Sequence, residues 1–202
     1  LITNTFLTPR QMIMAILDEF DIPHKLSWPK VKFLGTLNEY LIEQISMGFN
    51  VVLVIDEAQN LCLKALEEVR MLSNLETERE KLLQIILMGQ PSLRNTLCKP
   101  ALEQLRQRIN VYYHINPLKK EEASDYIRHR LKVSGANGNV IFDDISMDKI
   151  YAYSCGIPRK INAICEKALL TGFIKVVKTI NGDIIDEVAR ELNELSSVVT
   201  GN

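Results

Sequence analysis

Seven consecutive residues decide the fold of this chain: Val51-Val52-Leu53-Val54-Ile55-Asp56-Glu57. The first five are aliphatic, four of them are β-branched, and no polar residue alternates with them. Such a run is typical of a strand that is covered on both faces in a parallel α/β sheet. We therefore predict a buried parallel strand over residues 51–55, followed directly by two carboxylates.

Two further strands and two helices are predicted near this strand. A second apolar run, Leu82–Met88, is interrupted only by Gln84, and a weaker strand is expected over Asn110–Ile115. Apolar residues recur at three- and four-residue steps over residues 33–45 and 61–72, which is the spacing of an amphipathic helix. This alternation of strands and helices is typical of a parallel sheet with crossover connections.

The character of the sequence changes after Pro117. No strong strand signal follows, and helices are expected over residues 118–133, 146–154, 158–177 and 183–195. We therefore predict an α/β core over residues 1–117 and an all-α lid over residues 118–202. The fold class that we expect is α/β.

The composition is that of an ordinary globular chain. Of its 202 residues, 47% are hydrophobic, and 24 basic residues balance 25 acidic ones, which gives no sign of nucleic-acid binding. The four cysteines form no Cys-x-x-Cys pair, so the usual spacing of a zinc site is excluded. The amino-terminal residues lack the regions of a signal peptide, and no aliphatic run approaches the roughly 20 residues of a membrane helix. We expect a cytoplasmic protein with reduced thiols.

Two carboxylates, Asp56 and Glu57, follow the predicted strand at 51–55. Functional loops of a parallel sheet lie at the carboxyl ends of its strands, so both acids are expected at a ligand-binding edge. In nucleotide hydrolysis one carboxylate helps to hold the Mg²⁺ that bridges the phosphates, and a second polarises the attacking water. The alternative is an acidic turn or helix start, because Asp and Glu also favour helix N-termini.

Polar residues suited to the same chemistry lie near the other two predicted strands. Gln90 ends the second apolar run, where its amide could orient a water or contact a γ-phosphate, although a residue before Pro91 is also typical of a turn. Arg106 and Arg108 precede the third predicted strand, and a guanidinium group neutralises charge on a phosphoryl group. The alternative is a pair of solvated arginines on an amphipathic helix.

A third segment places cations at a predicted helix start. Pro158 suits the first helical position, so Arg159 and Lys160 fall in the first turn, where the helix dipole disfavours cations by about 1 kcal/mol or less. An anion held near this helix start would explain their placement. An ion pair with Asp143 or Asp144 is the alternative.

In this order, these features resemble the AAA+ ATPase family. Residues 51–57 look like its Walker B strand, Gln90 matches the sensor-1 position, and Gly156-Ile157-Pro158-Arg159 looks like the sensor-2 motif. The resemblance implies that ATP and Mg²⁺ are cofactors. It implies that Asp56 helps to hold Mg²⁺, that Glu57 activates water and that Gln90 senses the γ-phosphate.

The arginines take their expected roles from the same resemblance. Arg108 matches the arginine-finger position, with Arg106 as the second choice, and would act on the nucleotide of a neighbouring subunit. Arg159 matches the sensor-2 arginine that would move the lid. The resemblance therefore implies a homo-oligomer through the arginine-finger interface. It also implies a partial P-loop NTPase (AAA+) parallel sheet followed by an all-α lid domain.

A narrower resemblance runs from about Asn4 to about Leu195. It is to the general secretion pathway protein A group, which includes ATPases linked to secretion and to exosortase and exopolysaccharide loci. It rests on the motifs Asp56-Glu57-Ala58-Gln59-Asn60-Leu61, Arg70-Met71-Leu72-Ser73-Asn74-Leu75-Glu76-Thr77 and Gln84-Ile85-Ile86-Leu87-Met88-Gly89-Gln90-Pro91. The resemblance implies ATP hydrolysis coupled to remodelling or assembly of a secretion or polysaccharide-export system. Envelope components would be partners, and segments outside this chain would associate it with the inner membrane.

One motif of the family is missing. No glycine of the chain is followed by Lys and then Ser or Thr, so the P-loop signature that cradles the phosphates is absent. Asn4-Thr5-Phe6-Leu7-Thr8-Pro9 resembles the family's segment just after its second strand, which would place the P-loop upstream. We favour this truncation over a degenerate member because the carboxylates and arginines named above are all present. In the family, the strand that leads into the P-loop lies between the strands that match Gln84–Met88 and Asn110–Ile115. Its loss would leave two interior sheet edges unpaired.

Two functions of other classes stay open. A non-catalytic assembly scaffold would keep this fold without nucleotide chemistry, and a GKT or GKS about 40 residues before Asn4 would favour the enzyme. A DNA-linked ATPase of the transposition or origin-binding type has a similar fold. The balanced charge argues against DNA, and salt-dependent DNA binding would favour it.

We predict that the 202-residue chain alone neither hydrolyses ATP nor binds it tightly, because the P-loop amides and lysine that hold the phosphates are absent. Phosphate release and ATP titration with the purified chain measure this. Turnover that Glu57→Gln abolishes in this chain would contradict the prediction.

Overall fold

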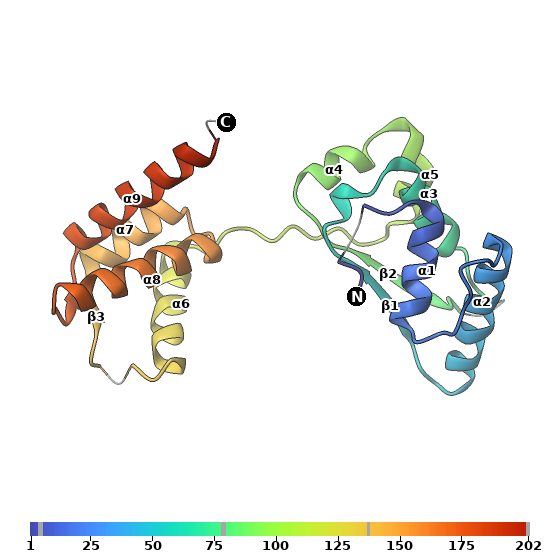
Figure 1. The fold of residues 1–202 in the computed structure, drawn as a ribbon, viewed down its shortest axis with the longest axis horizontal. Coiled ribbons are helices and arrows are strands. Elements are labelled where there is room, and N and C mark those ends of the chain that lie inside the picture. Colours follow the sequence, from blue (N-terminus) through green and yellow to red (C-terminus); the bar gives the residue numbers. More distant parts are fainter. Residues whose placement is uncertain (4–5, 78–79, 137, 201–202) are drawn as a thin grey trace. The chain divides into compact units, whose positions relative to one another are not determined.

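The computed structural model describes residues 1–3, 6–77, 80–136 and 138–200, with side chains described as far as residue 192. Asn4 and Thr5, at the start of the segment expected to follow a second strand, lie outside these residues. The chain divides into two compact units, Leu1–Tyr112 and Tyr113–Asn202, a few residues before Pro117. Figure 1 shows the ribbon of both units, and each unit has its own hydrophobic core.

The first unit contains the elements predicted around Asp56 and Glu57. In chain order they are α1 (Pro9–Glu19), α2 (Lys30–Ser46), β1 (Val51–Ile55), η1 (Ala58–Asn60), α3 (Leu63–Leu72), β2 (Leu83–Leu87), α4 (Ser92–Leu97), η2 (Pro100–Leu102) and α5 (Glu103–Arg108). The strands expected at 51–55 and 82–88 both form, and so do the helices expected within 33–45 and 61–72. The α/β class is thereby confirmed.

Strands β1 and β2 pair in parallel, and this pairing positions the ends of both. The register aligns Val51 with Leu83 and Ile55 with Leu87, so the two strands end at the same level. Ile2 forms an isolated parallel bridge to Ile55. The backbone N–H of Asp56, the next residue, donates to the Ile2 carbonyl at 2.9 Å. The amino-terminal residues therefore support β1 at its carboxyl end.

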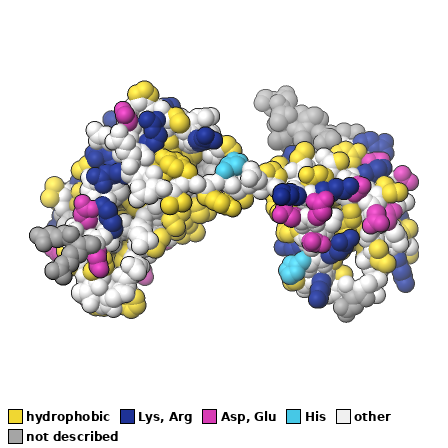
Figure 2. All heavy atoms as spheres, turned by 180° about the vertical axis from the view of Figure 1, so that it is seen from behind, with side chains coloured by type: hydrophobic (Ala, Val, Ile, Leu, Met, Phe, Trp, Pro, Cys, Tyr) yellow, Lys and Arg dark blue, Asp and Glu magenta, His cyan; other side chains and the backbone are white. Residues whose placement is uncertain are grey.

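The prediction that residues 51–55 are covered on both faces is wrong. Alternate residues of β1, Val51, Leu53 and Ile55, are buried in the core with the apolar faces of α1, α2 and α3. On the other face Val52 is 42% exposed and Ile86 of β2 is 47% exposed. Figure 2 shows hydrophobic side chains gathered on the surface of this unit. The aliphatic run is thus covered on one face only within the described residues.

The third predicted strand, Asn110–Ile115, does not form. Residues 109–119 are extended but join no ladder, and four apolar side chains in this segment stand more than half exposed: Val111, Tyr112, Tyr113 and Ile115. A strand needs a neighbour to accept its backbone hydrogen bonds, and β2 pairs only with β1 in the described part of the chain. The local apolar signal was therefore not sufficient to make a strand.

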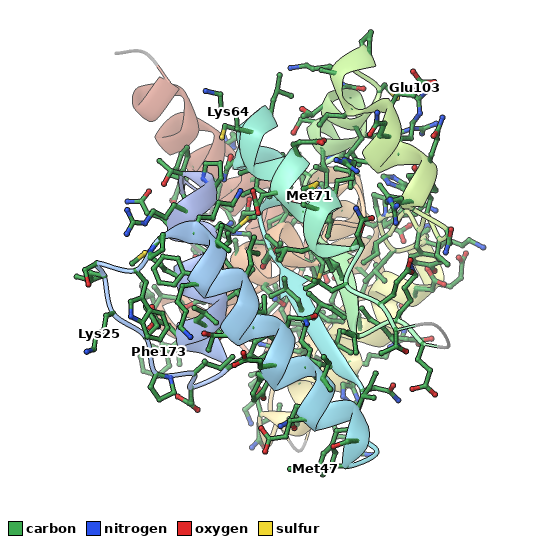
Figure 3. The ribbon with its side chains drawn as sticks, turned by 90° about the vertical axis from the view of Figure 1, so that its right-hand side faces the viewer. Lys25, Met47, Lys64, Met71, Glu103 and Phe173 are labelled. Carbon is green, nitrogen blue, oxygen red and sulfur yellow. The ribbon has the colours of Figure 1, made fainter. Side chains whose placement is uncertain are left out.

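Helix α3 is held against the start of α2 by a buried charge. The Glu68 side chain is 5% exposed, and its Oε2 accepts a hydrogen bond from Lys30 Nζ at 2.5 Å. Figure 3 shows Lys64 and Met71 along α3 and Met47 at the far end of α2. This pair fixes α3 beside the core and so supports the loop that joins β1 to α3.

The second unit is a helical bundle with one small ladder. Its elements are α6 (Lys120–Val133), β3 (Ile141–Phe142), α7 (Asp144–Ser154), α8 (Pro158–Ile174), β4 (Thr179–Ile180) and α9 (Gly182–Thr200). The four expected helices form, although α8 ends three residues earlier than predicted, after Ile174. The sequence did not predict β3 and β4, which pair in parallel over two residues each. Asn137, within the expected loop at 135–139, lies outside the described residues.

All four cysteines are free thiols, as expected from their spacing. Cys62, Cys98 and Cys155 are exposed, whereas burial raises the pKa of the Cys165 thiol to about 12. A thiol with that pKa carries almost no thiolate at neutral pH and is unreactive. Across the described ranges, every helix is too short or too polar to cross a membrane.

Helices α7 and α9 are joined by a network centred on Asp186. Its carboxylate accepts hydrogen bonds from Lys149 Nζ at 2.5 Å and from the Tyr153 hydroxyl at 2.9 Å. The hydrogen bond from Lys149, followed by that from Tyr153, lowers the pKa of Asp186. The hydrogen bond to Asp186 in turn raises the pKa of Lys149 and of Tyr153.

We predict that this network makes the stability of the second unit fall at acid pH. A depressed folded-state pKa stabilises the fold above the ordinary Asp value of about 3.9, and this is lost as pH falls through the folded-state pKa. Asp186→Asn should therefore lower the urea midpoint of the chain at pH 7 and leave it nearly unchanged at about pH 2. Circular dichroism follows the unfolding.

The matched control for this prediction is Asp125→Asn. Asp125 is 78% exposed, and its contact with Arg128 spans 3.4 Å, so we expect no change at either pH. An Asp186→Asn effect of equal size at pH 7 and pH 2 would contradict the assignment.

Candidate functional site

The parallel register brings Asp56, Glu57 and Gln90 to one edge of the sheet. Asp56 follows β1 directly, and Gln90 lies three residues beyond the end of β2. The two segments are joined beyond the ladder, because the backbone N–H of Ala58 donates to the Met88 carbonyl at 2.8 Å. Three of the predicted site residues thus lie at neighbouring carboxyl ends.

Glu57 has an unusual backbone conformation. Its φ of 49° and ψ of 34° place it in the left-handed region, which costs of order 1 kcal/mol or more for a residue with a Cβ. Its N–H donates to Asp56 Oδ1 at 2.7 Å, so Asp56 stabilises this turn. Glu57 precedes the short helix η1 but makes no side-chain cap to it, so the carboxylate is not used as a helix cap. Its side chain is exposed.

Gln59 also belongs to this site, although the sequence pattern did not predict it. Its Oε1 accepts the backbone N–H of Gln90 at 3.0 Å, and its Nε2 donates to Glu57 Oε2. The amide therefore joins the loop after β1 to the loop after β2. Its position inside the motif Asp56–Leu61 was visible, but the contact spans 31 residues in sequence and could not be deduced from spacing.

Gly89 explains how closely these two loops approach. A Cβ at Gly89 would lie 2.6 Å from Gln59 Oε1 and 3.3 Å from the Gln59 backbone nitrogen. Any larger side chain would push Gln59 aside. The glycine at the end of the second apolar run is therefore a packing requirement of the site.

The carboxylates of this site suit Mg²⁺ only together with a ligand that brings its own oxygens. No cluster of three or more His, Cys, Asp or Glu side chains able to hold a metal occurs within the described ranges. Mg²⁺ is commonly bound by one or two carboxylates plus phosphate oxygens and water. The partly buried Asp56 beside the exposed Glu57 matches that donor set.

Arg108 lies near the opposite edge of the sheet. The hydrogen bond from Lys81, followed by its charge, lowers the pKa of Glu76, and the charge of Arg108 adds to this effect. Glu76 and Lys81 form a bridge just before β2 begins, so Arg108 lies near the amino end of β2. The charge of Arg108 thus acts at the end of β2 that lies away from Gln90.

Arg106 and Arg108 both lie in the last turn of the six-residue helix α5. Cations are favoured there by the helix dipole. Both side chains are exposed, and the Arg106 carbonyl accepts a hydrogen bond from the Tyr112 hydroxyl at 3.3 Å. The structure is thus compatible with the solvated-arginine alternative as well as with a contact to a neighbouring subunit.

Arg159 and Lys160 lie exposed in the first turn of α8, as the sequence predicts. The alternative ion pair with Asp143 or Asp144 is not formed by the described side chains. The Asp143 carboxylate instead accepts the Ser146 N–H at 2.7 Å and caps α7. The two cations therefore stay available to an anion at this helix start.

Gly156 has a structural reason of its own. Its φ is +72°, its carbonyl accepts the Leu118 N–H at 2.9 Å, and a Cβ here would lie 2.0 Å from the Leu118 carbonyl oxygen. The glycine of the motif at 156–159 thus allows the chain before α6 to pack directly on the start of α8. It thereby fixes the turn that leads into the first turn of α8, where Arg159 lies.

An open hollow on the first unit is lined by Asp18, Asp21, Ile22, Pro23, His24 and Leu26. These residues belong to the end of α1 and the loop after it. None of them is among the predicted site residues. We therefore assign the candidate site by chemistry to the carboxyl ends of β1 and β2.

Comparison with known proteins identifies relatives of both units. The AAA domain family matches residues 2–97. General secretion pathway protein A of Aeromonas hydrophila is 39% identical over 184 residues, which cover 91% of this chain and 34% of that protein. An uncharacterized HTH-type transcriptional regulator of Methanocaldococcus jannaschii is 27% identical over 158 residues, 76% of this chain and 38% of the regulator. The chain spans about a third of the length of these relatives.

Solved structures share the fold at low sequence identity. Cdc6p of Pyrobaculum aerophilum is 18% identical with a TM-score of 0.67, covering 94% of this chain and 52% of that protein. The RuvB Holliday junction branch migration motor of Thermotoga maritima is 16% identical with a TM-score of 0.56, covering 95% of this chain and 61% of RuvB. These similarities bear on the fold of the chain.

We predict that Gly156→Ala destabilises the second unit by about 1–3 kcal/mol or more, because the methyl group meets the Leu118 backbone and the residue must keep a positive φ. Gly138→Ala is the matched control, since Gly138 has a φ of +79° but open space at its Cβ. Urea unfolding compares the two. Equal losses would show that the contact with Leu118 is unimportant.

Proposed function

Because residues 2–97 are a domain of the AAA family, in a chain with the fold of AAA+ P-loop NTPases, we propose that this protein binds and hydrolyses ATP. The observation that carries the proposal is the meeting of Asp56, Glu57 and Gln90 where β1 and β2 end. This is the edge at which ligands bind open parallel sheets. The 39% identity to general secretion pathway protein A supports the same assignment.

Each residue at this edge has a role that its position allows. Asp56 helps to hold Mg²⁺, which when bound neutralises charge on the phosphates. Glu57 accepts a proton from the attacking water through its exposed carboxylate. Gln90 contacts the γ-phosphate from the loop after β2. Together they orient a water against a phosphate group and balance its charge.

The arginines act from other places. The charge of Arg108 acts on Glu76, just before the amino end of β2. We assign Arg108 to the nucleotide of a neighbouring copy in a homo-oligomer, with Arg106 as the second choice. We assign Arg159 and Lys160, which lie exposed in the first turn of α8, to the binding of an anion at this helix start.

The coupled process follows from the relative. The name of the relative, general secretion pathway protein A, refers to protein secretion. We therefore propose that ATP hydrolysis drives remodelling or assembly of a secretion or polysaccharide-export machinery. In that setting the protein works on the cytoplasmic side of the inner membrane. A non-catalytic scaffold would share the fold but would have no need of the strained Glu57.

A DNA-linked ATPase is the second candidate. Two observations favour it: the 27% identity to an HTH-type transcriptional regulator, and the fold shared with RuvB and Cdc6p. The near-balance of 24 basic and 25 acidic residues argues against a large basic surface. DNA binding that weakens steeply with salt would move the assignment to this class.

We predict that Glu57→Gln in the full-length protein lowers kcat for ATP hydrolysis by about a hundredfold or more while ATP binding persists, because only the proton acceptor is lost. Phosphate release and equilibrium binding of a fluorescent ATP analogue measure the two effects. Glu103→Gln is the control, since Glu103 is an exposed carboxylate of α5.

A second arm of this experiment tests the arginine. Arg108→Ala subunits should be inactive alone and should regain activity when mixed with Glu57→Gln subunits, because each supplies what the other lacks. Mixtures without activity would contradict the assignment of Arg108 to a neighbouring site. Full activity of Glu57→Gln would contradict the proposed function itself.

A further inference from the structure

We propose that Gln59 is a positioning residue that holds the carboxylate of Glu57 and ties it to the backbone of Gln90. The inference rests on the proposed function for its effect on turnover, but the link itself is independent of that function. Gln59 Nε2 donates to Glu57 Oε2, and Gln59 Oε1 accepts the Gln90 N–H at 3.0 Å.

The orientation of the Gln59 amide is decided by chemistry. The Gln90 N–H can only donate, so it must meet the oxygen of the amide. The nitrogen of the amide then faces Glu57, whose carboxylate can only accept when ionised. The amide oxygen of Gln59 cannot donate to Glu57, and its nitrogen cannot accept from the Gln90 N–H. The two partners therefore fix a single orientation of the Gln59 amide group.

The surroundings leave this amide little freedom. Gln59 is half-buried, and the preceding residue Ala58 is fully buried and bonded through its N–H to the Met88 carbonyl at 2.8 Å. Gly89 lies so close that a Cβ would approach Gln59 Oε1 to 2.6 Å. A displacement of the loop at Gly89 and Gln90 must therefore move the Gln59 amide.

The consequence is a mechanical connection between two parts of the site. Glu57 is held in a left-handed conformation with a φ of 49° and is connected through one amide to the residue assigned to the γ-phosphate. When a phosphate group draws Gln90 toward it, the Gln59 oxygen follows the Gln90 N–H and its nitrogen shifts against Glu57. The position of Glu57 thus depends on whether a γ-phosphate is in contact with Gln90.

The link is tested first in the 202-residue chain without nucleotide, by NMR of the Gln90 amide. Gln59→Met should speed its hydrogen exchange by about two- to tenfold, the loss expected for one hydrogen bond. Gln104→Met, at an exposed position of α5, should change nothing. If the chain with Gln59→Met does not fold, Gly89→Ala displaces the same amide, with Gly35→Ala as its control because nothing lies within 4 Å there.

The connection to Glu57 is tested by a double-mutant cycle. Glu57→Gln should shift the Gln90 amide resonance when Gln59 is present and should have no such effect in the Gln59→Met background. Gln59→Glu keeps the oxygen that Gln90 needs but loses the donor to Glu57, so the Gln90 amide should stay protected. An unchanged Gln90 amide in Gln59→Met, or equal shifts in both backgrounds, would overturn the proposal.

The role in turnover is tested in the full-length protein with ATP and Mg²⁺. Gln59→Met and Gln59→Glu should lower kcat by about ten- to a hundredfold and leave KM for ATP nearly unchanged, because positioning is lost while binding is not. A loss confined to KM, or no loss at all, would overturn the positioning role and leave the proposed function standing. Absence of hydrolysis in the unmutated protein would overturn the proposed function, and with it the role in turnover, while the amide measurements still decide whether the link exists.

Discussion

The parallel pairing of β1 with β2 is the constraint on which the candidate site depends. Its register places Ile55 opposite Leu87, so both strands end at one level and their polar successors meet. A slip of one residue would turn the buried Leu53 to the exposed face and separate Asp56 from Gln90. The register is thus coupled to the core, because Leu53 and Ile55 are buried with the apolar residues of α1, α2 and α3.

Much of this arrangement could be predicted from local sequence. The aliphatic run at 51–55 and the three- and four-residue spacing of α2 and α3 specify elements that need few distant contacts. The segment at 110–115 has a similar local signal but joins no ladder, because a strand is completed only by a neighbour. For the same reason the exposure of Val52 could not be read from the run itself: burial on a face depends on what lies over it.

In the candidate site, too, some features follow from the local sequence and others depend on contacts between distant segments. The meeting of Asp56 and Gln90 follows from the rule that parallel strands end together, which needs only their order. The bridge through Gln59 and the approach of Gly156 to Leu118 depend on distances between segments remote in sequence. Gly89 and Gly156 lie in motifs on which the family resemblance rests. Each glycine is also explained by packing within the chain, because a Cβ would approach Gln59 or Leu118 too closely.

The extended segment at 109–119 has a practical consequence for handling the protein. It carries Tyr112 and Tyr113, which are 61% and 89% exposed, in backbone that belongs to no helix or ladder. Proteases cleave where backbone can be drawn into their active-site cleft, and those that select aromatic side chains find two adjacent sites here. Brief digestion with such a protease would separate Leu1–Tyr112 from the helical unit and so provide each for study on its own.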